Sequence, residues 1–268
     1  MIGLFFMSNK GSHFLRRLVW LSTAISCCFL LSQCATHREK SNKEKAYLHT
    51  NIGNKYLVAG QSPAALKEFL AAEKLDPDNA KLQNNLALAY YVRKSYVLAE
   101  KHVRRALQLD PNFTEARNNL GKILTNMGLF DEAIQVLKIA TEDLTFKQPD
   151  TTWSNLGIAY FAKGDFKNAN SALQRSLEIS SEHCTTYTYY GRSFLELKDY
   201  TKASQALDQA LQLCSGAIKT EAKFFGALSY IRAQKKDQGI ARLQEIIEES
   251  PNLDYAERAK KLLNIIKQ

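Results

Sequence analysis

AKLQNNLALAYYVRKSYVLAEKHVRRALQLDPNF, from Ala80 to Phe113, is the stretch that decides the fold. Small and apolar residues recur in both of its halves with the spacing of one helix face: Leu86, Ala87 and Tyr90, then Ala99, Val103 and Ala106. This spacing predicts two antiparallel helices that approach closely at their small residues. Pro111 ends the second helix, because proline has no N–H and disfavours helical dihedrals in the residue before it.

Three columns of this stretch return along the chain at one set of intervals. The first-helix small residue recurs at intervals of 34, 34, 36, 34 and 36 residues: Gly53, Ala87, Gly121, Gly157, Gly191 and Ala227. A second-helix small residue and an aromatic-rich column keep the same intervals: Ala65, Ala99, Ala133, Ala169, Ala203 and Gly239, then Tyr56, Tyr90, Leu124, Tyr160, Phe194 and Tyr230. A period of about 34 residues with this pattern resembles the tetratricopeptide repeat (TPR).

The resemblance implies an all-α TPR solenoid of six antiparallel helix hairpins that form a right-handed superhelix. The predicted repeats together cover 46–253: 46–79, 80–113, 114–149, 150–183, 184–219 and 220–253. An apolar stripe after them predicts a capping helix over 254–268: Ala256, Ala259, Leu262, Leu263 and Ile266.

The first 33 residues lie outside the repeats and have the pattern of a signal peptide. Basic residues precede an apolar run from Leu18 to Leu31, and this run is too short for a comfortable membrane span. Leu31-Ser32-Gln33-Cys34 resembles the lipobox of bacterial lipoproteins, although Gln33 replaces the usual small residue. The resemblance implies lipidation of Cys34. The alternatives are an uncleaved membrane anchor and a cysteine that follows an apolar run by chance.

Residues 34–45 are predicted to form a lipidated cysteine and a polar, charge-rich tether. Fully extended, the tether after Cys34 would reach at most about 35–40 Å. Ala35 stands where an aspartate would be expected in lipoproteins that stay in the inner membrane. The resemblance therefore implies a lipid-anchored protein on the periplasmic face of the outer membrane.

The composition gives little support to catalytic, metal or nucleic-acid functions. The formal charge is +9, but basic and acidic residues alternate, as on a solvated helix face, so we expect no nucleic-acid partner. The five histidines are scattered through the signal, the tether and separate repeats: His13, His37, His49, His102 and His183. Because no catalytic constellation, metal-ligand cluster or phosphate-binding loop is visible, we predict a protein that is not an enzyme and has no cofactor.

Cys184 and Cys214 are predicted to lie at adjacent ends of the fifth hairpin, whereas Cys27 and Cys28 fall within the signal core. The preferred interpretation of Cys184 and Cys214 is a pair of partly buried thiols. A disulfide is the alternative, which an oxidising periplasm would permit.

The first helices of a TPR array usually line a concave groove. The predicted lining combines apolar, aromatic and amide side chains: Asn54, Leu57, Val58, Asn84, Leu88, Tyr91, Val92, Asn118, Lys122, Ile158 and Phe161. Such a surface suits a peptide or helix of a partner protein. For Leu88 or Val92 the alternative is packing between repeats.

Asn85, Asn119 and Asn155 recur in one column and are interpreted as structural. Glu115 stands where a carboxylate-clamp TPR would need a cation, which argues against a chaperone C-terminus as the ligand.

The order of lipobox, charged tether and six hairpins resembles the type IV pilus biogenesis lipoproteins, the PilF/PilW/Tgl group of outer-membrane pilotins. The lengthened third hairpin, at LTFKQPDTTWSNLG, adds to the resemblance. It implies a protein that binds the pilus secretin subunit, travels with the lipoprotein transport machinery and promotes secretin assembly. The alternatives are a periplasmic TPR lipoprotein that scaffolds peptidoglycan enzymes or another envelope complex, and an inner-membrane-anchored cytosolic adaptor.

Overall fold

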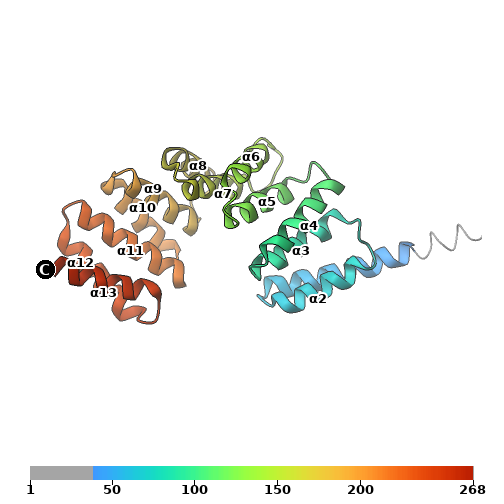
Figure 1. Cartoon of the computed structure of the whole chain (residues 1–268), viewed down its shortest axis with the longest axis horizontal. Coiled ribbons are helices and arrows are strands. Elements are labelled where there is room, and N and C mark those ends of the chain that lie inside the picture. Colours follow the sequence, from blue (N-terminus) through green and yellow to red (C-terminus); the bar gives the residue numbers. More distant parts are fainter. Residues whose placement is uncertain (1–38, 268) are drawn as a thin grey trace, which may run out of the picture. The chain divides into compact units, whose positions relative to one another are not determined.

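A computed structural model describes residues 39–267, and over this range the chain is all-helical with no strand (Figure 1). The predicted all-α array of consecutive hairpins is confirmed. None of the described helices has both the length and the apolar character that a membrane crossing requires. The predicted signal peptide, the predicted lipidation residue Cys34 and the first part of the predicted tether lie outside the described residues.

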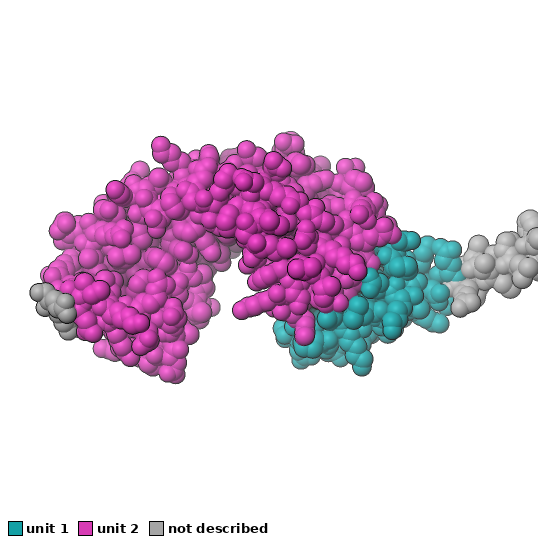
Figure 2. Space-filling view, in the orientation of Figure 1, with its two compact units in different colours: residues 1–82 teal, residues 83–268 magenta. Residues whose placement is uncertain are grey.

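The described residues divide into two compact units, residues 39–82 and 83–267 (Figure 2). In unit 1, a helix over 39–58 packs on α2 (Ser62–Glu73), and His49 Nδ1 lies 2.7 Å from Glu68 Oε2. The first helix therefore includes residues 39–45, which we had assigned to the polar, charge-rich tether. A Glu39–Lys43 ion pair at helical spacing supports this early start.

Unit 2 contains the remaining described helices. Its helices are α3 (Ala80–Val92, which begins in unit 1), α4 (Tyr96–Leu109), α5 (Thr114–Asn126), α6 (Phe130–Thr141), α7 (Pro149–Lys163), α8 (Phe166–Ile179), α9 (Cys184–Glu196), α10 (Tyr200–Leu213), α11 (Gly216–Arg232), α12 (Lys236–Glu249) and α13 (Asp254–Lys267). The first helix of the sixth hairpin begins at Gly216, earlier than the predicted 220. The first helices α5, α7, α9 and α11 also contact one another in series and form an inner layer. Figure 2 shows that unit 2 curves around a hollow.

The column of small residues marks the closest approach of the two helices in a hairpin. A Cβ atom on Gly121 would lie 2.3 Å from Leu137 Cγ, and one on Gly157 would lie 2.5 Å from Leu173 Cγ. Both leucines are fully buried. The recurring glycine therefore makes room for a core leucine of the partner helix, as the spacing predicted.

The turn inside each hairpin has a left-handed residue that keeps the same repeat intervals. The six residues are Gly60, Lys94, Gly128, Gly164, Lys198 and Gln234, with φ between 59° and 87°. Glycine is the usual choice in this conformation because it has no Cβ to clash with the backbone. Since three of the six are not glycine, the column is not visible as a glycine pattern in the sequence.

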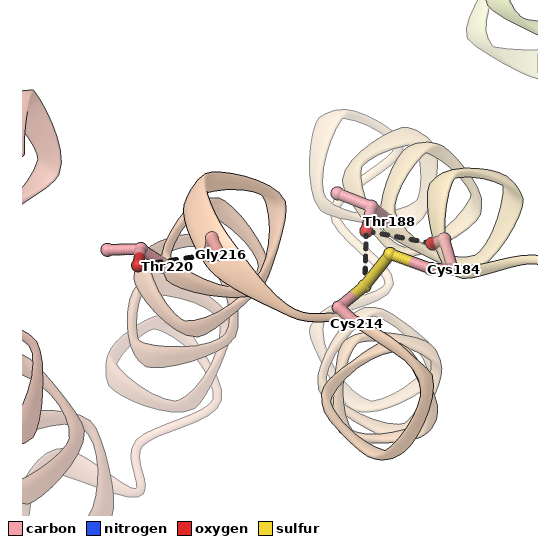
Figure 3. The surroundings of a disulfide bond; sticks show 5 residues. All are labelled: Cys184, Thr188, Cys214, Gly216 and Thr220. Carbon is pink, nitrogen blue, oxygen red and sulfur yellow. Dashed lines mark hydrogen bonds between the residues drawn. A yellow bond between two sulfur atoms is a disulfide. The ribbon is translucent and has the colours of Figure 1, made fainter. Parts of the chain in front are cut away.

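Cys184 and Cys214 form a disulfide, where the sequence favoured two thiols. Cys184 is the first residue of α9, and Cys214 follows the last residue of α10, with Cα atoms 5.1 Å apart. The bond ties the open end of the fifth hairpin just before α11 begins at Gly216 (Figure 3). The Thr188 hydroxyl lies 3.8 Å from Cys214 Sγ and bonds the Cys184 carbonyl at 3.0 Å.

The lengthened connection between α6 and α7 is held to α5 by Asp143. Its carboxylate accepts hydrogen bonds from the Thr114 hydroxyl at 2.5 Å and from the Thr145 backbone and hydroxyl at 2.9 and 2.7 Å. The Thr114 bond, followed by the Thr145 bonds, lowers the pKa of Asp143 to about 2. The extra residues of the third hairpin are thus anchored at the first residue of α5.

The stability of this connection should depend on pH. In the folded chain Asp143 remains ionised down to about pH 2, whereas in the unfolded chain it takes up a proton near its ordinary pKa of 3.8. The carboxylate therefore contributes stability above the higher value, and this contribution is lost as the pH falls through the lower one. Asp143→Asn should lower the thermal unfolding midpoint at neutral pH, and its difference from wild type should shrink toward pH 2. A difference that stays constant, or the same pH dependence in Glu142→Gln, would contradict this assignment.

Candidate protein-binding groove

The inner layer of unit 2 contains a cavity of about 680 Å³ that is open to solvent. The lining comes from α3, α5, α7 and α9 and from the residues just before α7 and α9. Four predicted groove residues lie in it: Tyr91, Asn118, Lys122 and Ile158. Its volume is within the range of ligand sites, and most of its lining is polar, with few apolar side chains.

Asparagine side chains connect the helices that line the cavity. Asn119 Nδ2 donates to Asn84 Oδ1 at 2.9 Å, and Asn84 Nδ2 donates to Glu115 Oε1 at 3.0 Å. Asn84 is buried with 1% of its surface exposed, so it holds α3 against α5 and has no surface for a ligand. Asn155 Nδ2 donates to Asn118 Oδ1 at 3.0 Å. This bond leaves the Asn118 NH₂ group as a donor at the cavity.

Lys122 brings a positive charge to the same lining. Its Nζ lies 4.7 Å from the centre of the Tyr91 ring, in cation–π range. Asn126 Nδ2 fixes this ring by donating to the Tyr91 hydroxyl at 3.1 Å. The Lys122 side chain keeps solvent exposure, yet protein atoms crowd its ammonium and burial lowers its pKa. No ion pair to Lys122 is present within residues 39–267.

The opposite wall of the cavity is held by contacts between α7 and α9. The Ser154 and Thr186 hydroxyls lie 2.8 Å apart, and His183 Nε2 lies 2.5 Å from Asp150 Oδ2. Cys184 also lines the cavity, so the disulfide fixes the start of this wall. Among the described residues no group of His, Cys, Asp and Glu side chains could hold a metal ion.

Arg192 is at the centre of an aromatic cluster next to the cavity. Its guanidinium carbon lies 4.7 Å from the Phe161 ring centre, 5.0 Å from that of Tyr189 and 4.4 Å from that of Phe225. Nη1 pairs with Glu221 Oε1 at 2.5 Å. The rings come from α7, α9 and α11, so this cluster extends the inner surface beyond the cavity. Phe161, a predicted groove residue, belongs to it.

The remaining predicted groove residues lie outside the cavity, in both units. In unit 2, Leu88 is half-buried and Val92 is 55% exposed, and neither lines the cavity. In unit 1, Asn54 and Leu57 are half-buried on the helix over 39–58, and Val58 is 91% exposed. The structure thus brings together Tyr91, Asn118, Lys122 and Ile158 in one cavity, with Phe161 in the adjoining aromatic cluster.

Arg192 and Tyr189 were absent from the predicted groove, although the repeat intervals could have found them. Arg192 continues the column of Lys122 and Ile158, at steps of 36 and 34 residues. Tyr189 and Phe225 continue the asparagine column of Asn119 and Asn155. This column was interpreted as structural, and Asn119 and Asn155 do form hydrogen bonds to neighbouring helices, but both also line the cavity together with Tyr189.

Models of one family match most of the helical array. Four tetratricopeptide repeat models match residues 50–113, 93–146, 148–216 and 227–253. The chain is a tetratricopeptide repeat protein. TPR arrays are typically non-enzymatic scaffolds that bind other proteins. No curated protein matches the chain.

Solved structures share the fold of this TPR protein at low sequence identity. A crystal structure of PilW, described as a widely conserved type IV pilus biogenesis factor, is 18% identical with a TM-score of 0.73 and covers 81% of this chain and 98% of its own. The Pseudomonas aeruginosa PilF structure is 19% identical with a TM-score of 0.70 and covers 82% and 99%. A chain of the APC/C Cut9–Hcn1 hetero-tetramer is 22% identical with a TM-score of 0.70, but only 47% of that chain is covered. At these identities the similarity establishes the fold alone.

Proposed function

We propose that this TPR protein is an outer-membrane lipoprotein that binds the type IV pilus secretin subunit through its inner groove and promotes secretin localisation and multimer assembly. Lipidated Cys34 anchors the chain on the periplasmic face, and the groove of unit 2 holds the partner. The lipoprotein transport machinery then carries both to the outer membrane, where assembled secretin supports pilus formation.

The observation that carries the proposal is the combination of a lipobox-like sequence with an array of matching extent. Leu31-Ser32-Gln33-Cys34 precedes the first described helix by only a few residues. The array then covers nearly the full length of the PilW and PilF chains, whereas it covers less than half of the APC/C chain. The cavity supplies polar donors and an unpaired cation for a protein segment, and the adjoining rings supply apolar surface.

A deletion strain tests this function directly. Without the gene, we expect secretin to remain monomeric and surface pili to be absent, as seen by gel analysis of secretin and by electron microscopy. Wild type and Cys28→Ser should restore both, since Cys28 lies in the apolar run before the lipobox. Cys34→Ser should restore neither and should not incorporate labelled palmitate. Normal secretin multimers in the deletion strain would refute the proposal.

A further inference from the structure

The groove of unit 2 has two cations in one repeat column, and only one of the two has an ion-pair partner among the described residues. Lys122 on α5 and Arg192 on α9 occupy equivalent positions, with Ile158 between them on α7. Arg192 is neutralised by Glu221 at 2.5 Å and enclosed by three rings. Lys122 has a ring contact with Tyr91 but no carboxylate within ion-pairing distance in the described chain. Of these two cations, Lys122 therefore has its charge available to a ligand.

Two neutral hydrogen-bond donors line the cavity with Lys122, together with the amide oxygens of Asn119 and Asn155, whose NH₂ groups are used in bonds to Asn84 and Asn118. The Asn118 NH₂ group is available because Asn118 Oδ1 accepts the bond from Asn155. The Tyr91 hydroxyl accepts from Asn126, so its own proton can be donated. An ammonium without a carboxylate partner among residues 39–267, in a lining that also offers these two donors, favours an anionic group on the ligand. A carboxylate has the required acceptors.

The same cavity also has apolar lining at Ile158 and Tyr189. Beyond these residues the inner surface continues over the Phe161 and Phe225 rings around Arg192. The acidic groups of the opposite wall are Asp150, which pairs with His183, and the exposed Glu182. Because the surface continues past the Lys122 site, a bound chain can run through the cavity without ending there.

We propose that this cavity binds an extended segment of the partner protein in which an internal Asp or Glu side chain pairs with Lys122 and a nearby apolar side chain packs on Ile158 and Tyr189. The inference rests on the proposed function in that the groove holds a protein. The inference specifies which side chains of the partner segment the groove recognises.

Selection from a phage library of short random peptides tests this chemistry without assuming the partner. The full chain, solubilised in detergent, is used as bait, and the displayed peptides have no free C-terminal carboxylate. Wild type should enrich peptides with Asp or Glu beside an apolar residue. Lys122→Glu should instead enrich Lys or Arg at the acidic position. Lys138→Glu is the matched control. Lys138, on α6, also lies over a tyrosine ring, 6.0 Å from the centre of Tyr160, but it is outside the cavity. This variant should keep the wild-type peptide preference.

Affinities of one selected peptide then measure the charge pair. Lys122→Met should weaken binding about tenfold, the loss expected for one partly buried charge pair. Changing the peptide acid to Lys should abolish binding to wild type and restore it to Lys122→Glu, which also shows that the variant is folded. Amidation of the peptide C-terminus should have no effect.

Several results would overturn the inference. These are failure to enrich any peptide, enrichment without acidic residues, an acidic preference that survives Lys122→Glu, or binding that requires a free C-terminal carboxylate. If acidic peptides bind as expected but secretin does not, the proposed function fails while this inference stands. If secretin binds with no dependence on Lys122, the inference fails while the proposed function stands.

Discussion

The Leu137→Ala variant should lose about 3 kcal/mol of unfolding free energy, since truncation of a fully buried leucine typically costs 2–5 kcal/mol. Leu137 has no exposed surface and packs against Gly121 between α6 and α5. Urea unfolding followed by fluorescence suits this measurement, because Trp153 packs against the same core cluster. Ile139→Ala, on the same helix but at a position that is 50% exposed, should cost less than about 1 kcal/mol. Equal losses for the two variants would contradict the assigned packing.

A double-mutant cycle tests the Gly121–Leu137 contact itself. Gly121→Ala alone should destabilise by about 1–3 kcal/mol, because its new Cβ would overlap the Leu137 side chain. In the Leu137→Ala background the overlapping atoms are gone, and alanine is favoured over glycine within a helix by about 1 kcal/mol. The same substitution should then be neutral or stabilising. Additive losses would indicate that the two positions do not share one packing space.

Removal of the Cys184–Cys214 disulfide should be the second large effect. The bond closes a loop with a sequence separation of 30 residues, and chain entropy predicts about 3–4 kcal/mol of stabilisation for such a loop. Cys184→Ala/Cys214→Ala should therefore unfold at a lower urea concentration than oxidised wild type. Reduced wild type should unfold near the double variant.

Mass spectrometry gives the control for the disulfide. Reduction should add two hydrogens to the wild-type chain and none to the double variant. An unchanged wild-type mass would show that the thiols are not bonded. A mass shift without any loss of stability would instead show that the fifth hairpin is held together without the bond.

The repeat columns predicted the helical array because close packing imposes them. Gly121 and Gly157 recur because a Cβ at either position would overlap a core leucine of the second helix. The spacing of these glycines therefore indicates where both helices of each hairpin lie. The start of the first helix was missed because residues 39–45 are highly charged and resemble a linker. Ion pairing of Glu39 with Lys43 and continuity with the packed part of the helix outweigh that composition.

The candidate site was predictable only in part, because its charge pattern depends on contacts between repeats. Position in the repeat predicted Tyr91, Asn118 and Lys122, which line the cavity. Sequence position could not reveal that the Asn84 side chain is hydrogen-bonded to Glu115 and Asn119, or that Arg192 forms an ion pair with Glu221. These pairings join neighbouring helices whose relative rotation decides which side chains meet. The cysteine pair was left open for a similar reason, since adjacent helix ends do not decide whether two thiols are bonded.

Co-purification of the secretin subunit with the tagged full chain tests the central claim most directly. Membranes would be solubilised from cells that express wild type, Lys122→Glu or the Lys138→Glu control at equal levels. The proposed function and the groove assignment together predict that secretin is recovered with wild type and Lys138→Glu and is depleted about tenfold or more with Lys122→Glu. Absence of secretin from the wild-type eluate, while the chain itself is recovered intact and lipidated, would contradict the claim that this TPR protein binds secretin.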